Sequence, residues 1–163
     1  MVQKLMQIRY NNNMVEFYAK SEADTEVVAT RIAIKTQPKD VIGLSGELGA
    51  GKTTFARAFI NAFPGKLEEV PSPTFTIAQT YNRNGTEIQH FDLFRLKHFT
   101  EAYEIGIEDA FINSISLIEW PDRLGPALPA DYLNIRIDLR KKNSERTIKL
   151  YGSDTWALRL LNI

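Results

Sequence analysis

Apolar residues in the first third of the chain follow the spacing expected for strands that alternate with helices. Ser21 stands at a predicted helix N-cap, ahead of acidic residues in the first turn. The short apolar run DVIGLS is typical of a strand buried on both faces of a parallel sheet, and three phenylalanines at four-residue intervals then predict a helix with one apolar face. We therefore expect strand, helix, strand and helix in turn over 15–19, 22–36, 40–45 and 53–63.

The rest of the chain predicts hairpins and a further buried strand. Asn84 and Gly85 separate two strand-like runs and mark a hairpin turn. Thr100 is the expected cap of a short helix that Gly106 interrupts. Extended segments are expected at 75–82, 86–93, 114–120, 132–140 and 146–151, and helical ones at 101–105, up to 112, within 121–129 and at 154–162. This order predicts an α/β sandwich whose mixed sheet has a parallel core and antiparallel edge strands.

Size and composition fit one globular domain over residues 1–163. Hydrophobic residues make up 44% of the chain and charged residues 25%, with a formal net charge of zero, so a strongly basic nucleic-acid binder is disfavoured. Cysteine is absent, which excludes disulfides and thiolate metal sites. No apolar run is long enough to span a membrane, and the N-terminus lacks a signal-peptide core. A cytoplasmic location is therefore expected, with residues 1–13 poorly ordered.

The segment GELGAGKT, from Gly46 to Thr53, matches the phosphate-binding pattern G-x-x-x-x-G-K-[ST] in full. Glycines let the main chain approach phosphate oxygens, so that successive N–H groups form an anion cradle at the start of a helix. Lys52 adds a charge for the β- and γ-phosphates, and the Thr53 hydroxyl is a ligand for Mg²⁺. A P-loop NTPase-like three-layer sandwich is therefore expected, with the nucleotide held by Gly46, Glu47, Leu48, Gly49, Ala50, Gly51, Lys52, Thr53 and Thr54.

Two acidic residues are expected to face this cradle, since a P-loop enzyme needs carboxylates to hold Mg²⁺ and to orient the attacking water. Glu119 is the first charge after the apolar run SISLI, and Asp92 ends the run EIQHFD. Both belong at the C-terminal ends of strands beside the P-loop. The residues alone leave open which acid holds the metal, and the competing interpretations are a loop acid for Glu119 and an ion pair with Arg95 for Asp92.

Other residues near these motifs have more than one interpretation. Thr74, in a loop held by two prolines, is either a switch residue that senses the γ-phosphate or an ordinary turn threonine. His90 is interpreted as a strand side chain rather than a base, because the sequence identifies no partner for it. Strand alternation would turn Trp120 away from Glu119 and into the core, with a wall of the site as the alternative. A basic cluster is either a solvated turn or a weak contact to a phosphate backbone: Lys141, Lys142 and Arg146.

Four sequence blocks together resemble the TsaE (YjeE) family, small bacterial P-loop ATPases needed for threonylcarbamoyladenosine modification of tRNA. The blocks are GELGAGKTTF, SPTFT, HFDLFRL and LIEWPDR, and they span residues 46–123. The first is shared with many ATPases, whereas the other three together are far more specific. The one visible departure is Phe94, at a position where the family commonly has tyrosine.

The resemblance implies ATP or ADP on the P-loop, with Mg²⁺ held by Thr53 and Glu119 and a catalytic or metal-linked Asp92. It makes Thr74 a switch-loop residue and Trp120 the family's tryptophan beside the acid. The expected catalytic residues are therefore Lys52, Asp92, Glu119 and Thr74, and the expected metal ligands are Thr53, Glu119 and Asp92. The resemblance also implies TsaD-like and TsaB-like partner proteins, with tRNA involved only indirectly.

Two other functions stay open on the sequence. One is a small-molecule kinase, although no long arginine-rich insertion is present to form its lid. The other is a nucleotide-dependent assembly switch without turnover. A GTPase is disfavoured because the chain lacks an Asn-Lys-x-Asp element. No arginine finger can be assigned, so slow intrinsic hydrolysis that rises with the partner proteins is expected.

Overall fold

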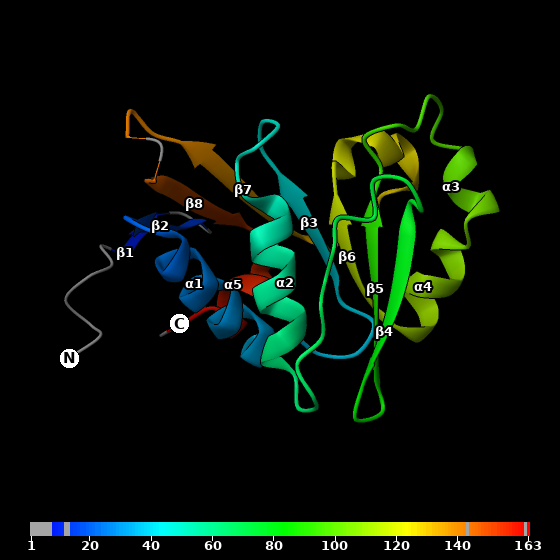
Figure 1. Ribbon diagram of the computed structural model, residues 1–163, viewed down its shortest axis with the longest axis horizontal. Coiled ribbons are helices and arrows are strands. Elements are labelled where there is room, and N and C mark those ends of the chain that lie inside the picture. The colour runs from blue at the N-terminus through cyan, green and yellow to red at the C-terminus, as the bar shows by residue number, and fades with distance from the viewer. Residues whose placement is uncertain (1–7, 12–13, 143, 162) are drawn as a thin grey trace.

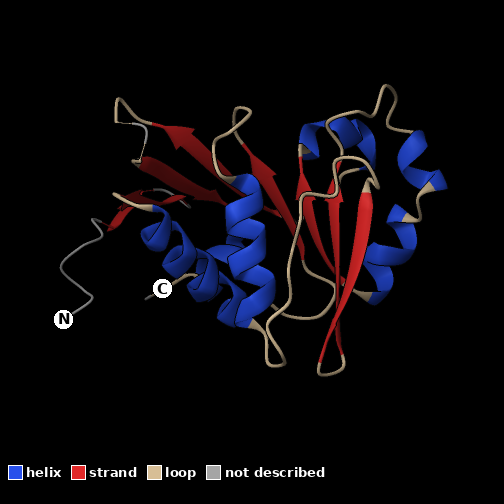
Figure 2. Ribbon diagram, viewed as in Figure 1, coloured by secondary structure: helices blue, strands red, loops and turns tan. Residues whose placement is uncertain are grey.

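Eight strands form one twisted mixed sheet in the computed structural model, which describes residues 8–11, 14–142, 144–161 and 163 (Figures 1 and 2). Their order across the sheet is β1-β2-β8-β7-β3-β6-β5-β4. The strands are β1 (Ile8–Asn11), β2 (Met14–Ala19), β3 (Val41–Ser45), β4 (Ala78–Arg83), β5 (Thr86–Asp92), β6 (Ile115–Glu119), β7 (Leu133–Leu139) and β8 (Arg146–Tyr151).

The central strands β7, β3, β6 and β5 run parallel, and every other pairing in the sheet is antiparallel. The expectation of a parallel core with antiparallel edges is confirmed. The apolar run DVIGLS predicted β3, and the residues of this strand are buried on both faces of the sheet. In-register pairing places Leu44 and Asp92 on either side of Glu119, so the carboxyl ends of β3, β5 and β6 meet at one edge.

Helices cover both faces of the sheet and make the three expected layers (Figure 1). One apolar cluster includes residues of α1, α2 and α5, and α1 and α2 lie side by side; the other cluster includes residues of α3, α4 and the 3₁₀ segment η2. The helical elements are α1 (Glu22–Lys35), α2 (Lys52–Ala62), α3 (Glu101–Glu104), α4 (Ile107–Asn113), η2 (Pro121–Ala127) and α5 (Asp154–Arg159). None of the helices in the described ranges is long and apolar enough to cross a membrane.

Ser21 caps α1 as predicted, because its side chain accepts a hydrogen bond from the main-chain N–H of Asp24. Thr100 does not cap α3: it is itself in the helical region and its side chain makes no capping bond. The carboxylate of Glu101 instead accepts from the main-chain N–H groups of Lys97 and His98. A side chain inside the helix thus reaches back to the preceding loop, which a search for N-cap residues does not detect.

Two strand boundaries also differ from the expectation. β4 begins at Ala78, not at residue 75, because Ile77 has a φ of 66° and donates its N–H to the Pro73 carbonyl in a turn. Residues 8–11 form β1 on the edge of the sheet, although poor order was expected there. The rest of that expectation, for residues 1–7, 12 and 13, lies outside the described residues.

Candidate nucleotide-binding site

The predicted P-loop joins β3 to α2 and turns back on itself at its glycines. Gly46, Gly49 and Gly51 have φ values of 145°, 78° and 107°, which side chains rarely allow. A Cβ atom at Gly46 would also collide with the main-chain carbonyl of Ile137. The loop therefore has a backbone conformation that glycine allows without strain, and the glycines are needed for its shape.

Lys52 lies almost fully buried at the start of α2. Its Nζ donates to the carbonyl oxygens of Gly46 at 2.9 Å and Glu47 at 2.7 Å, and it lies 4.2 Å from the centre of the Trp120 ring. Burial lowers the pKa of Lys52 below the usual 10.5, and the nearby carboxylates, led by Glu119, partly oppose that shift. The ammonium is thus desolvated and positioned inside the loop before any phosphate arrives.

Glu119 ends β6 and forms a hydrogen-bonded chain with residues of α2 and β5. Its Oε1 accepts from the Thr53 hydroxyl at 3.1 Å and lies 2.9 Å from His90 Nε2. Both Glu119 and His90 are buried. His90 is a strand side chain of β5, as expected, but it has a partner that the sequence did not identify, because its ring contacts the predicted metal-ligating carboxylate.

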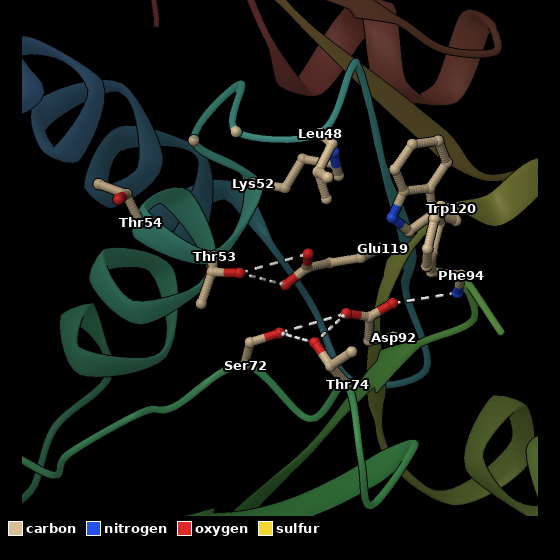
Figure 3. Close-up of a pocket in the computed structure, with 12 residues that line it drawn as sticks. Leu48, Lys52, Thr53, Thr54, Ser72, Thr74, Asp92, Phe94, Glu119 and Trp120 are labelled. Carbon is tan, nitrogen blue, oxygen red and sulfur yellow. Dashed lines mark hydrogen bonds between the residues drawn. The ribbon is translucent and has the colours of Figure 1, made fainter.

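Asp92 ends β5 and anchors the loop that precedes β4. Its Oδ2 accepts from Thr74 Oγ1 at 2.9 Å and from Ser72 Oγ at 3.2 Å, while its Oδ1 accepts from the main-chain N–H of Phe94 (Figure 3). Among the described residues no ion pair joins Asp92 to Arg95, whose guanidinium stacks on Phe75 instead. Thr74 thus lies in a turn, and its hydroxyl is hydrogen-bonded to the acid; a switch role for it stays a prediction.

A cavity of about 300 Å³ opens between the P-loop and these acids (Figure 3). This volume is at the lower end of the range for small-molecule sites. Lys52 and Thr53 line one side and Asp92 and Glu119 another. Three residues of the predicted cradle do not line the cavity; two of them supply the carbonyls that hold Lys52. The three are Gly46, Glu47 and Ala50.

Trp120 and Phe94 line the cavity with a tilted pair of rings whose centres are 5.0 Å apart. Strand alternation predicted that Trp120 faces away from Glu119, and that part is wrong because both line this cavity; the expected packing against the core is present as well, against the second apolar cluster. Trp120 follows the last residue of β6 and has a φ of 61°, so the chain has already left the pleat and turns the ring back toward Lys52. The tryptophan is a wall of the site.

The oxygen atoms at the cavity suit magnesium better than a softer metal. Thr53, Asp92 and Glu119 offer a hydroxyl and two carboxylates, which are the hard donors that Mg²⁺ prefers together with water and phosphate oxygens. The described residues contain no cluster of three or more histidine, cysteine or acidic side chains that could hold a metal. These side chains therefore fit a metal that arrives with phosphate groups.

Three residues of this site were not identified from the sequence. The signal for His90 was present, because His90 and Asp92 are two apart on one strand and so point to the same face. Ser72 lay inside a quoted block but had no assigned role, and it bonds both Asp92 and Thr74. Arg146 comes from the far hairpin and donates its Nε to the Ala50 carbonyl at 2.7 Å; no local pattern predicts that contact.

Known proteins are similar to this chain in sequence. The family model for "Threonylcarbamoyl adenosine biosynthesis protein TsaE" matches residues 19–148. The chain is 37% identical over 123 residues to the tRNA threonylcarbamoyladenosine biosynthesis protein TsaE of Rickettsia felis, covering 76% of this chain and 72% of that one. It is 36% identical over 126 residues to the Bacillus subtilis protein of the same name, covering 77% of each.

The fold has a counterpart among solved structures. The crystal structure of Bacillus subtilis YdiB superposes with a TM-score of 0.76 at 26% identity, covering 94% of this chain and 93% of the other. The matched family segment contains the P-loop, both acids and the loop that carries Thr74. On the sequence match and the shared fold together, the chain belongs to the TsaE family.

Proposed function

We propose that the chain is a Mg²⁺-dependent ATPase subunit that acts in the cytoplasm in threonylcarbamoyladenosine modification of tRNA. It would work with TsaD-like and TsaB-like proteins and meet tRNA only through them. The family supports the pathway. The observation that supports the chemistry is that the same cavity is lined by the glycine-rich loop, by the buried Lys52 and by two buried carboxylates, Asp92 and Glu119.

Several residues of the cavity make contacts that support a specific task in this function. The main-chain N–H groups of the P-loop and the Lys52 ammonium would bind phosphate oxygens, because both present positive charge in a partly desolvated site. Trp120 and Phe94 would exclude water from one side of the cavity. The hydroxyl of Thr53 and the carboxylate of Glu119 would hold Mg²⁺, with Asp92 as a further metal ligand.

Mg²⁺ held by these residues would neutralise negative charge on the phosphate groups. Glu119 is held by Thr53 and His90 in an orientation that needs little rearrangement for this task. Asp92 holds the loop of Thr74, so a residue that senses the terminal phosphate and a residue that can orient water are hydrogen-bonded to each other. Catalysis by Lys52, Asp92, Glu119 and Thr74 is therefore part of this proposal.

The test is ATP hydrolysis by the purified chain with and without a TsaD-like and TsaB-like pair. We expect slow, Mg²⁺-dependent release of phosphate that rises when the pair is added, and loss of that activity in Lys52→Ala. Phosphate that appears on a metabolite rather than in solution would favour a small-molecule kinase. Tight ATP binding without turnover, in the presence of the pair, would favour an assembly switch.

A further inference from the structure

The chain between the end of α2 and the start of β4, all of which the structure describes, contains no helix or strand and runs back along α2 (Figure 1). Its second half is the loop 71–77, which carries Thr74. Its first half, residues 63–70, is called the strap below. Residues 64–69 of the strap are all exposed. Apolar packing therefore contributes little to the position of the strap there, and hydrogen bonds from neighbouring elements fix it.

Asn61, in the last turn of α2, holds the strap with two reciprocal hydrogen bonds. Its Nδ2 donates to the Glu68 carbonyl at 3.0 Å, and its Oδ1 accepts from the Glu68 N–H at 3.0 Å. The side-chain amide thus satisfies both main-chain groups of one residue, as a neighbouring strand would. Arg57, one turn earlier on the same side of α2, donates its Nε to the Val70 carbonyl at 3.4 Å.

Arg83 holds the strap from the side of the sheet. It ends β4 and is almost completely buried. Its guanidinium donates to the main-chain carbonyls of Phe63, at 3.0 Å, and Lys66, and its Nη1 lies 3.2 Å from the Glu68 carboxylate. The strap is therefore fixed on one side by the helix that begins at Lys52 and on the other by the edge strand of the sheet.

Little slack separates the Asn61 contact from Thr74. Residues 69–73 alone lie between Glu68 and Thr74, and two of them are prolines, Pro71 and Pro73. Each proline has a fixed φ and restricts the residue before it to extended conformations, so this short segment is stiff. At its far end the Thr74 hydroxyl is bonded to Asp92 at 2.9 Å. A displacement at Glu68 is therefore passed on to Thr74.

We propose that Asn61 is a positioning residue for the reaction, because its grip on Glu68 sets where the Thr74 hydroxyl lies in the cavity. This inference rests on the proposed function. Lys52 and Thr53 begin the helix that Asn61 ends, so the same contact keeps Thr74 in a fixed relation to the groups that bind phosphate. Asn61 does not line the cavity, and it acts through the strap rather than on the ligand.

The test compares turnover with affinity in Asn61→Leu, which removes both hydrogen bonds, keeps the size of the side chain and favours the helix. In the presence of the TsaD-like and TsaB-like pair, we expect kcat for ATP to fall about tenfold because Thr74 is displaced. The affinity for Mg-ATP, measured by calorimetry, should change less than about twofold, since the P-loop is intact. Amide hydrogen exchange over 74–77 should become faster in the free protein.

Thr30→Leu is the matched control, because Thr30 is exposed on the neighbouring helix α1 and its hydroxyl bonds the Glu26 carbonyl of that helix. It should change neither kcat nor the exchange over 74–77. A double-mutant cycle then shows whether Asn61 acts through Thr74. In a Thr74→Val background, Asn61→Leu should lower kcat by less than about twofold.

The same tenfold loss of kcat in both backgrounds would overturn the proposal, and so would unchanged turnover in Asn61→Leu. A loss of Mg-ATP affinity as large as the loss of kcat would also overturn it, because Asn61 would then only support α2 and the P-loop. Native protein that hydrolyses no ATP with the pair would instead overturn the proposed function, and the exchange over 74–77 would still test the contact. Circular dichroism of each variant shows whether it is folded.

Discussion

Lys52 carries a buried charge at the start of α2. Its Nζ donates to two main-chain carbonyls and faces the Trp120 ring. In Lys52→Ala the phosphates lose a charge-assisted contact, so we expect ATP affinity to fall about 10- to 100-fold and turnover to disappear. Calorimetry with Mg-ATP and a phosphate-release assay measure the two effects. Unchanged affinity would contradict the assignment of the cradle.

The same lysine predicts how nucleotide binding depends on pH. Because burial lowers its pKa below 10.5, the ammonium loses its proton at a lower pH than a free lysine does. Phosphates bind the charged form, so ATP affinity should begin to fall as pH rises through that lowered value. In Lys52→Arg the charge persists, and this pH dependence should vanish. A fall that begins only above 10.5 in the native protein would contradict the prediction.

His90 acts on the site through Glu119 rather than on the ligand. It is fully buried, and its Nε2 lies 2.9 Å from the carboxylate that we expect to hold Mg²⁺. In His90→Leu the carboxylate loses one of its two fixed partners, so the apparent Mg²⁺ affinity in the presence of ATP should fall about tenfold. His90→Gln retains a donor and should recover part of that loss. Titration of ATP binding with Mg²⁺ measures both variants, and equal behaviour of the two would argue against positioning.

At the scale of elements, the loop 71–77 is tied to β5 by two side chains and by one main-chain hydrogen bond, from the Asp92 N–H to the Ile77 carbonyl. Thr74 and Ser72 both bond Asp92. In Thr74→Val the shorter of these bonds is lost, so we expect faster amide hydrogen exchange over 71–77 and slower turnover, with ATP affinity little changed. Thr76→Val is the matched control, because Thr76 is exposed in the same loop. Equal exchange in the two variants would show that the Asp92 contact does not order the loop.

Elements were predictable from sequence where the local pattern and the tertiary environment agree. The apolar run before the P-loop fits only a buried strand, and the phenylalanines after it fit only a helix with one apolar face. Both are present, as β3 and α2. Trp120 was misplaced because alternation holds only inside a strand, and the chain leaves the strand one residue earlier. The contact of Arg146 with the P-loop depends on how two hairpin strands lie in the sheet, which no local window contains.

At the scale of the whole molecule, a bound nucleotide would connect the two faces of the sheet. The P-loop leads into α2, whose apolar face belongs to one cluster, while Trp120 packs against the other. A ligand that binds only the folded state stabilises it, by about 2.7 kcal/mol at 100 times its Kd. For a chain of this length that corresponds to a rise in Tm of about 5–10 °C with Mg-ATP.

Two variants separate this ligand effect from general stability. Lys52→Ala should lose most of the rise, because it removes a phosphate contact. Arg159→Ala breaks an ion pair with Asp40, which precedes β3 at the end away from the P-loop. It should lower Tm without ligand, since breaking a largely buried pair leaves Asp40 without its cation, yet keep the full rise with Mg-ATP. Thermal denaturation with and without Mg-ATP measures all three proteins. A rise that survives in Lys52→Ala would place the stabilising nucleotide somewhere other than the P-loop.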